Sequence, residues 1–420
     1  MPKTKTTPEL RFAGYSDPWE QRKVGTFASV LSASRVHKDE WRTEGVPFYR
    51  SSDVVSAFKG NDNERAFIST ELYEELIKSS GRLEKGDILI TGGGSIGIPY
   101  IVPNNEPLYS KDADLIWIKK SAEHDSQYLY AYFTSQGFHE YISSISHVGT
   151  IAHYTIEQVK DTPVLLPSVA EQSAIGLFFS QLDTLITLHQ RKYERLKTVK
   201  ASMLEKMFPR NGSNLPEIRF SGFTDPWEQR KLSEIATMHA RIGWQNLRKS
   251  EFLDSGDYYL ITGTDFVDGE VDLANCHYVT KDRFDQDPNI QIENGSILIT
   301  KDGTLGKVAY VKRLEKPATL NAGVFNVLIR DKKRVYGKYL FQYLKAPFLL
   351  DYVAQKATGG TIKHLNQEIL VDFPVVLPDY DEQVLLGDAF DDLDTLITLH
   401  QRKLEKLKQL KQSFLAKMFV

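Results

Sequence analysis

The segment LDTLITLHQRK occurs twice without a single change, at Leu182–Lys192 and at Leu393–Lys403. Each copy lies in a longer stretch, 168–208 or 379–419, in which apolar residues recur every three or four positions. This period predicts a long helix in each stretch. In the second stretch the acidic residues come early and the lysines late, which suits the helix dipole. A helix with one apolar stripe needs a partner, so we expect the two helices to pair antiparallel.

The repeat extends outward from these helices. Pro8–Lys23 reads PELRFAGYSDPWEQRK and Pro216–Lys231 reads PEIRFSGFTDPWEQRK, with 12 of 16 positions identical. Between the matching blocks, residues 24–148 and 232–359 share only short islands of sequence. Random divergence after a duplication would not leave a long helix nearly unchanged while it altered the sequence of a whole domain. We therefore interpret the chain as a shared frame that holds two different inserts.

The inserts mix strand and helix patterns. Apolar, β-branched segments at Asp87–Thr91 and Ser296–Thr300 precede glycine turns and predict strands, while aromatic-rich segments at Tyr128–Tyr141 and Tyr336–Val353 have a helical pattern. The predicted fold class is α+β with a pseudo-twofold internal repeat. We expect two mixed α/β domains, at 1–167 and 211–378. Each is followed by a long, coiled-coil-like helix, at 168–210 and 379–420, and we expect these two helices to be antiparallel.

Composition excludes several classes of protein. The 420 residues are 41% apolar and 25% charged, which is typical of a globular protein, and no stretch has the ~18 apolar residues that a membrane helix needs. The N-terminus has no apolar signal core, and Cys276 is the single cysteine, so we expect a cytoplasmic protein without a disulfide framework or a membrane partner. The net charge of −3 means that contacts with nucleic acid must be local or shared with a partner.

The glycines Gly92, Gly94 and Gly97 spell GxGxxG, which is the pattern of a dinucleotide or S-adenosylmethionine site. The residues after them, Ile98–Val102, have the pattern of a strand rather than of a helix start, and the second copy keeps only the last two glycines, as Gly303 and Gly306. We therefore predict a β-turn. No phosphate-binding loop and no trusted metal-ligand pair occurs, so we predict no catalytic, cofactor-binding or metal-binding residue in this chain.

The tripeptides Asp17-Pro18-Trp19 and Asp225-Pro226-Trp227 lie ahead of the two domains. They superficially resemble the Asp/Asn-Pro-Pro-Tyr/Phe motif of amino-methyltransferases, but the second proline is missing. We expect a docking or lid role for them, with simple burial of the aromatic ring as the alternative.

Taken together, these features resemble the specificity subunit of type I restriction–modification systems, over nearly the whole chain. The resemblance rests on doubled motifs in a fixed order: the R-F-x-G-[FY]-x-D-P-W-E-Q-R-K openings, the P-x-x-x-E-Q helix starts at Pro167 and Pro378, and the G-T-I-x-H turns at Gly149–His153 and Gly360–His364. Each motif is weak alone, and the doubled order is specific.

The resemblance implies two target-recognition domains, each reading one half of a split double-stranded DNA target. It also implies that the helices set the spacing and dock two copies of the modification subunit. Those subunits would carry S-adenosylmethionine and methylate adenine N6. Restriction subunits would add ATP- and Mg-dependent translocation and cleavage. No cofactor is expected in this chain itself.

A loop that faces DNA should occupy the same position in both copies but contain different residues. Three pairs of loops fulfil this condition: one after a short strand, one at the glycine turn, and one at the G-T-I-x-H turn. The predicted DNA-binding residues in them are Arg50, Ser51, Ser52, Thr91, Ser95, Thr150, His153 and Tyr154 in the first half, and Thr262, Thr264, Lys301, Asp302, Thr304, Lys307, Thr361, Lys363 and His364 in the second. Their polar groups suit base edges in the major groove or phosphates. The alternative is that these are ordinary turns capped by Thr and Ser.

Additional phosphate contacts are expected near the domain starts, from Arg35, Lys38, Arg241, Arg248 and Lys249. Two other functions stay open. A scaffold or adaptor would bind partners without reading bases. A self-sufficient methyltransferase or nuclease would need catalytic motifs, which are missing.

Overall fold

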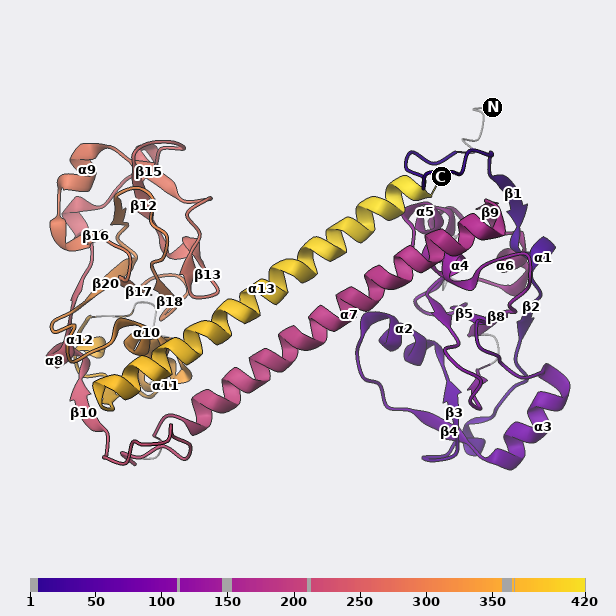
Figure 1. The fold of residues 1–420 in the computed structure, drawn as a ribbon, viewed down its shortest axis with the longest axis horizontal. Coiled ribbons are helices and arrows are strands. Elements are labelled where there is room, and N and C mark those ends of the chain that lie inside the picture. The colour runs from indigo at the N-terminus through magenta and orange to yellow at the C-terminus, as the bar shows by residue number, and fades with distance from the viewer. Residues whose placement is uncertain are drawn as a thin grey trace. The chain divides into compact units, whose positions relative to one another are not determined.

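The computed structural model describes residues 7–111, 114–145, 153–209, 213–356, 365 and 367–419. It forms two compact units, one made of residues 1–191 with 401–420 and the other of residues 192–400. Each unit therefore combines one mixed domain with the start of one long helix and the end of the other (Figure 1).

The first unit contains short helices and strands in alternation. Its helices are α1 (Val24–Phe27), α2 (Ser51–Lys59), α3 (Thr70–Ser80), α4 (Ser126–Phe133), α5 (Gln136–Ile145), α6 (Ile156–Asp161) and the start of α7 (Val169–Lys206), with a 3₁₀ turn at Lys38–Glu40. Its strands are β1 (Glu20–Lys23), β2 (Val30–Ser32), β3 (Val46–Tyr49), β4 (Ala66–Ile68), β5 (Ile88–Thr91), β6 (Pro99–Ile101), β7 (Tyr109–Ser110), β8 (Leu115–Ile118) and β9 (Pro163–Leu166).

The second unit repeats this order with more strands. Its helices are α8 (Leu232–Ile235), α9 (Lys281–Asp285), α10 (Gly337–Lys345), α11 (Pro347–Lys356), α12 (Gln367–Val371) and the start of α13 (Tyr380–Met418), with 3₁₀ turns at Gly243–Gln245, Lys249–Glu251, Gly263–Asp265 and Pro288–Ile290. Its strands are β10 (Glu228–Lys231), β11 (Ala236–His239), β12 (Tyr258–Ile261), β13 (Phe266–Val267), β14 (Glu270–Val271), β15 (His277–Val279), β16 (Gln291–Ile292), β17 (Ile297–Thr300), β18 (Val308–Tyr310), β19 (Ala318–Leu320), β20 (Val324–Ile329) and β21 (Pro374–Leu377).

The central sheets of the two units share their strand order. In the first unit the order is β2-β8-β5-β6, and the second unit contains the matching run β11-β20-β17-β18, extended by β14 and β13. The register is also shared, because Leu89 opposes Trp117 and Leu298 opposes Asn326 in matching strands. All four residues of β5 and of β17 are buried, which explains their unbroken apolar sequence. The predicted strands and the predicted repeat are therefore confirmed.

The two long helices pair antiparallel within each unit, as the sequence predicts. In the first unit Asp183 binds Lys411 (2.6 Å), and Phe178 packs edge-on against Phe414, so the start of α7 runs opposite to the end of α13. In the second unit Lys200 binds Asp394 (2.6 Å), and the ring of Phe208, just beyond α7, packs against that of Phe390. The predicted apolar stripe is only partly used for this pairing, since Leu185, Val199, Leu396 and Leu410 are exposed.

In each unit the opening motif, which we call the arm (Pro8–Lys23 or Pro216–Lys231), contacts the motif at the start of the long helix through a buried ion pair. The Arg11 guanidinium donates two hydrogen bonds to the carboxylate of Glu171 (2.6 and 2.8 Å), and Arg219 does the same to Glu382 (2.8 Å twice). Both glutamates are 1% exposed. Each arm is therefore fastened to the first turn of the long helix of its unit.

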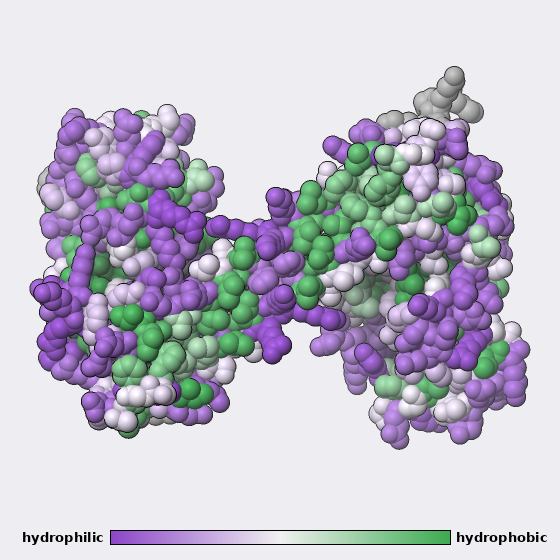
Figure 2. Space-filling view, in the orientation of Figure 1, coloured by the Kyte–Doolittle hydropathy of each residue, from purple (hydrophilic) through white to green (hydrophobic). Residues whose placement is uncertain are grey.

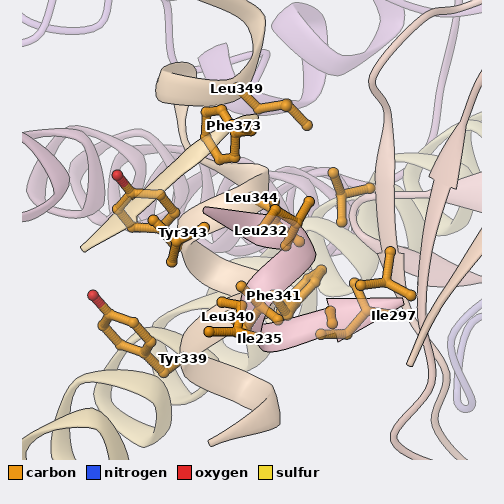
Figure 3. Close-up of a cluster of buried hydrophobic side chains, with 14 of the residues drawn as sticks. Leu232, Ile235, Ile297, Tyr339, Leu340, Phe341, Tyr343, Leu344, Leu349 and Phe373 are labelled. Carbon is orange, nitrogen blue, oxygen red and sulfur yellow. The ribbon is translucent and has the colours of Figure 1, made fainter. Parts of the chain in front are cut away.

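A buried tyrosine pair fastens each domain to the strand that precedes its long helix. The hydroxyl of Tyr339 donates to Val376 O, and that of Tyr343 donates to Pro374 O (3.2 Å). Figure 3 shows the ring of Tyr343 near Phe373 and that of Tyr339 near Leu340, among other apolar residues of this core. In the first unit, Tyr128 and Tyr132 make the same contacts with Leu165 O and Pro163 O.

The Asp-Pro-Trp tripeptides do not form a lid, and this expectation was wrong. Trp19 is 2% exposed and packs against Tyr128, while Trp227 is 3% exposed and packs against Tyr339. Burial of the two large rings completes the same cores, as the alternative predicts. A docking role for the exposed Asp17 and Asp225 stays a prediction.

Candidate nucleic-acid interface

The three predicted loops of the first unit meet at one end of β5. The Ser51 hydroxyl donates to Asp114 O (2.8 Å), and the Gly92 amide donates to the same carbonyl (2.8 Å). The Tyr154 amide in turn donates to Gly92 O (2.8 Å), and Gly93 forms a β-bridge with His153. Segments that are far apart in the sequence thus form one continuous surface, which we call the loop cluster.

The second unit builds the same cluster at the end of β17. The Lys301 amide donates to Gly323 O (2.9 Å), and the Leu365 amide donates to Lys301 O (2.8 Å). The first loop of this unit, which begins at Thr262, lies against them, because a Cβ on Gly263 would come within 2.9 Å of Thr300 Cγ2. Both copies therefore place three predicted loops together.

The middle loop is a glycine turn of identical construction in the two units. Gly94 and Gly97 have φ angles of +70° and +78°, and Gly303 and Gly306 have +73° and +69°. These are the glycines that both copies keep, and L-residues with a side chain rarely adopt such angles. A strand, β6 or β18, comes after the turn in each case. The predicted turn, with a strand and not a helix after it, is confirmed.

The predicted contacts that the structure describes differ in exposure. The accessible side chains are Ser52, Ser95 and His153 in the first unit and Thr264, Thr304 and Lys307 in the second. Ser51, Thr262, Lys301 and Asp302 are half-buried. The Lys307 ammonium donates to Phe266 O (2.7 Å), which leaves further donors for another acceptor. These residues stay the predicted DNA contacts.

Thr91 and Tyr154 are corrections to the predicted set. Thr91 is fully buried, and its hydroxyl donates to Ser95 O and accepts from Ile98 N (2.9 Å), so it closes the glycine turn. Tyr154 is 1% exposed, with its hydroxyl against Thr162. Buried side chains cannot reach a base, and these two shape the loops instead.

Arg241 is also a correction, because its guanidinium group is buried inside the protein. Arg50 is half-buried and bonds within the protein, and it stays a predicted contact. Arg50 donates to both carboxylate oxygens of Asp53 (2.8 and 3.2 Å) and to Glu64 O, and the hydrogen bond to Asp53 raises its pKa. Arg241 is 1% exposed and donates to Leu320 O (2.9 Å) and Gln286 Oε1 (3.0 Å). We assign Arg241 to the positioning of loops.

Four predicted contacts lie outside the described residues, namely Thr150, Thr361, Lys363 and His364. One basic residue was missed. Lys111 lies at the loop cluster of the first unit, since its ammonium pairs with the Asp114 carboxylate and its amide donates to Tyr49 O (2.8 Å). It belongs to a diverged segment without a matching island, so a comparison of the two copies gave no signal for it.

Among the described residues, no group of three or more His, Cys, Asp or Glu side chains is arranged to hold a metal ion. No described helix combines the length and the apolar character needed to cross a membrane.

This arrangement, two different loop clusters on a repeated frame, agrees with what comparison with known proteins shows. The family model described as "Type I restriction modification DNA specificity domain" matches residues 16–198 and again residues 224–409. The chain therefore belongs to the family of type I restriction–modification specificity proteins, whose role is recognition of DNA sequence. Members of this family are non-catalytic, and the catalytic activities lie in partner subunits.

Individual relatives extend over nearly the whole chain. The specificity subunit of the type I restriction enzyme EcoBI from Escherichia coli is 21% identical over 96% of this chain and 86% of its own length. The MjaIX specificity subunit from Methanocaldococcus jannaschii is 21% identical over 95% of this chain and 92% of its own. The crystal structure of the type I S subunit from M. genitalium matches with a TM-score of 0.66 at 17% identity, over 99% of each chain, so the fold is the same.

Proposed function

We propose that this chain reads a bipartite, asymmetric DNA target, one half-site with each loop cluster. The observation that carries the proposal is the contrast between the two units. The frame contacts are repeated nearly atom for atom, whereas the exposed residues at matching loop positions differ. Ser52 and Ser95 stand in the first unit where Thr264 and Thr304 stand in the second, and Lys307 has no lysine as its counterpart. Two different readers on one frame imply two different half-sites.

The net charge of −3 fits a reader that shares the duplex with partners. Phosphate contacts supply most of the affinity for DNA, and base contacts supply the specificity. A chain without an overall basic surface can supply the base contacts while partner subunits hold much of the backbone. We propose two modification subunits, with S-adenosylmethionine, and restriction subunits, with ATP and Mg, as these partners.

A repeated apolar surface on the long helices supports two docking sites. In the first unit Leu185, Leu188 and Leu410 are 43%, 45% and 38% exposed. Their counterparts in the second unit, Leu396, Leu399 and Val199, are 42%, 44% and 39% exposed. Figure 2 shows apolar residues along both helices. We call each set a helix patch, and contiguous exposed apolar residues of this kind mark protein interfaces.

The test of the whole proposal is co-expression with the modification subunit in a host that lacks adenine methylation. Mapping of N6-methyladenine across the genome should reveal one split motif with two unlike halves and a fixed gap. A stable complex that methylates no adenine would favour the scaffold function instead. Methylation by this chain without any partner would favour a self-sufficient methyltransferase.

The helix patches give a separate prediction. The double substitution Leu185→Asp and Leu396→Asp should weaken binding of the modification subunit about tenfold to a hundredfold, because buried charge replaces apolar contact at both sites. Both leucines are exposed in the isolated chain, so its thermal unfolding should hardly change. Leu31→Asp, at an exposed leucine away from the helices, is the matched control. If Leu31→Asp weakens binding of the modification subunit as much as the double substitution does, docking through the helix patches is wrong.

A further inference from the structure

The first unit contains an open groove between its domain and the start of α7, with a volume of about 530 Å³. Phe58 of α2, Pro99 and Ile101 of β6 and Leu188 of α7 supply apolar walls. Tyr130 of α4 adds a ring and Asp183 of α7 a carboxylate, and Arg191, about two turns further along α7, adds a guanidinium group at the edge of the groove.

The second unit fills the matching place with its own lysines. Lys338 and Lys312 both bind Asp391 (3.0 and 2.5 Å), and Lys345 and Lys200 both bind Asp394 (3.1 and 2.6 Å). Gln342 also donates to Asp394 (2.8 Å). Burial would raise the pKa of Asp394, but Lys345 and Lys200 outweigh it and lower that pKa. The Asp394 carboxylate therefore has its hydrogen-bond partners within the same unit.

The repeat shows what the first unit lacks at the same positions. Gln127 stands where the second unit has Lys338, Thr134 where it has Lys345, and Ser180 where it has Asp391. The one retained carboxylate is that of Asp183, the counterpart of Asp394. Within the described residues it pairs with Lys411 through one oxygen, and its side chain is 34% exposed compared with 18% for Asp394.

The second unit also shows the geometry of a cation in this place. The Lys345 ammonium lies 5.4 Å from the ring centre of Phe341 while it binds Asp394. Tyr130 is the counterpart of Phe341 and lines the groove with Asp183. A ring face and a carboxylate together form a suitable site for an ammonium or guanidinium group.

We infer that the groove of the first unit receives a lysine or arginine side chain from the modification subunit. This inference rests on the proposed function. Leu188 belongs both to the groove and to the helix patch, so the groove continues the proposed docking surface. The two docking sites are therefore unequal: the first unit takes a basic side chain from its partner, and the second already holds its own.

The test closes the groove with the pair that the second unit uses. The variant Gln127→Lys with Ser180→Asp copies Lys338 and Asp391, and it should fold because the repeat supports the same ion pair. Native mass spectrometry and calorimetric titration with the modification subunit should show two copies bound to wild type. In the variant, one copy should bind at least about tenfold more weakly. The reverse variant in the second unit, Lys338→Gln with Asp391→Ser, should keep both copies.

The outcomes separate this inference from the proposed function. If wild type binds no modification subunit, the proposed function fails. If wild type binds two copies and the closed variant binds both with unchanged affinity, the inference fails and the function stands. Equal weakening by the reverse variant would also overturn the inference, because the effect would then come from the helices in general.

Two further measurements distinguish the chemistry of the occupant. Asp183→Asn should weaken the same copy and reduce the salt dependence of its binding, since it removes the charge that a basic side chain would meet. Asp394→Asn, at the internally filled counterpart, should leave partner binding unchanged. Calorimetry with spermidine alone tests a free polyamine. Saturable binding that the closed variant loses, without any effect on the partner, would assign the groove to the polyamine and overturn the inference.

Discussion

Arg219→Ala is expected to lower the free energy of unfolding by about 3–5 kcal/mol, because it strands a buried carboxylate. Glu382 is 1% exposed and receives both of its charged hydrogen bonds from Arg219, at 2.8 Å each. The substitution removes both donors and leaves the charge in place. Urea-induced unfolding followed by circular dichroism measures the loss. Arg11→Ala should act in the same way through Glu171 in the first unit.

Two controls make this prediction specific. Arg219→Lys keeps the positive charge but cannot form the paired hydrogen bonds, so an intermediate loss is expected. Arg230→Ala removes an exposed partner of Glu228 in the same unit and should have little effect. If the free energy of unfolding of Arg219→Ala equals that of wild type, the arm does not stabilise the start of the helix.

Lys307→Ala is expected to relax recognition in one half-site only, by about tenfold to a hundredfold in methylation of the cognate over the altered half-site. Lys307 is exposed at the glycine turn of the second unit, and its ammonium keeps donors beyond the one used by Phe266 O. Methylation of a library with each half-site randomised measures the effect. Lys363→Ala, at a residue outside the described ones, carries the same prediction.

The kind of loss identifies the kind of contact. A base contact gives a loss confined to one half-site, whereas a phosphate contact weakens all sequences equally and reduces the dependence on salt. Lys332→Ala is the control, because Lys332 pairs with Glu293 ahead of β17, at the opposite end of that strand from the turn. Unchanged preference in both half-sites would remove Lys307 from the reading surface.

The repeat in the sequence locates the three loops, because residues differ there while the surrounding frame is shared. It does not show which side chains in a loop point outward, so the buried Thr91 could not be told from an exposed threonine. Only the structure shows that the Thr91 hydroxyl donates to Ser95 O within the protein. Lys111 escaped notice because no counterpart marks it.

The sequence by itself determined the elements that depend on local periodicity and on the repeat. The 3.6-residue period predicts the long helices, the buried apolar runs predict β5 and β17, and the shared glycines Gly94 and Gly303 require the turn. Only the tertiary structure decided how distant groups meet, because partner choice depends on long-range packing. It joined Arg219 to Glu382, buried Trp227, and filled with lysines in one unit the groove that the other unit leaves open.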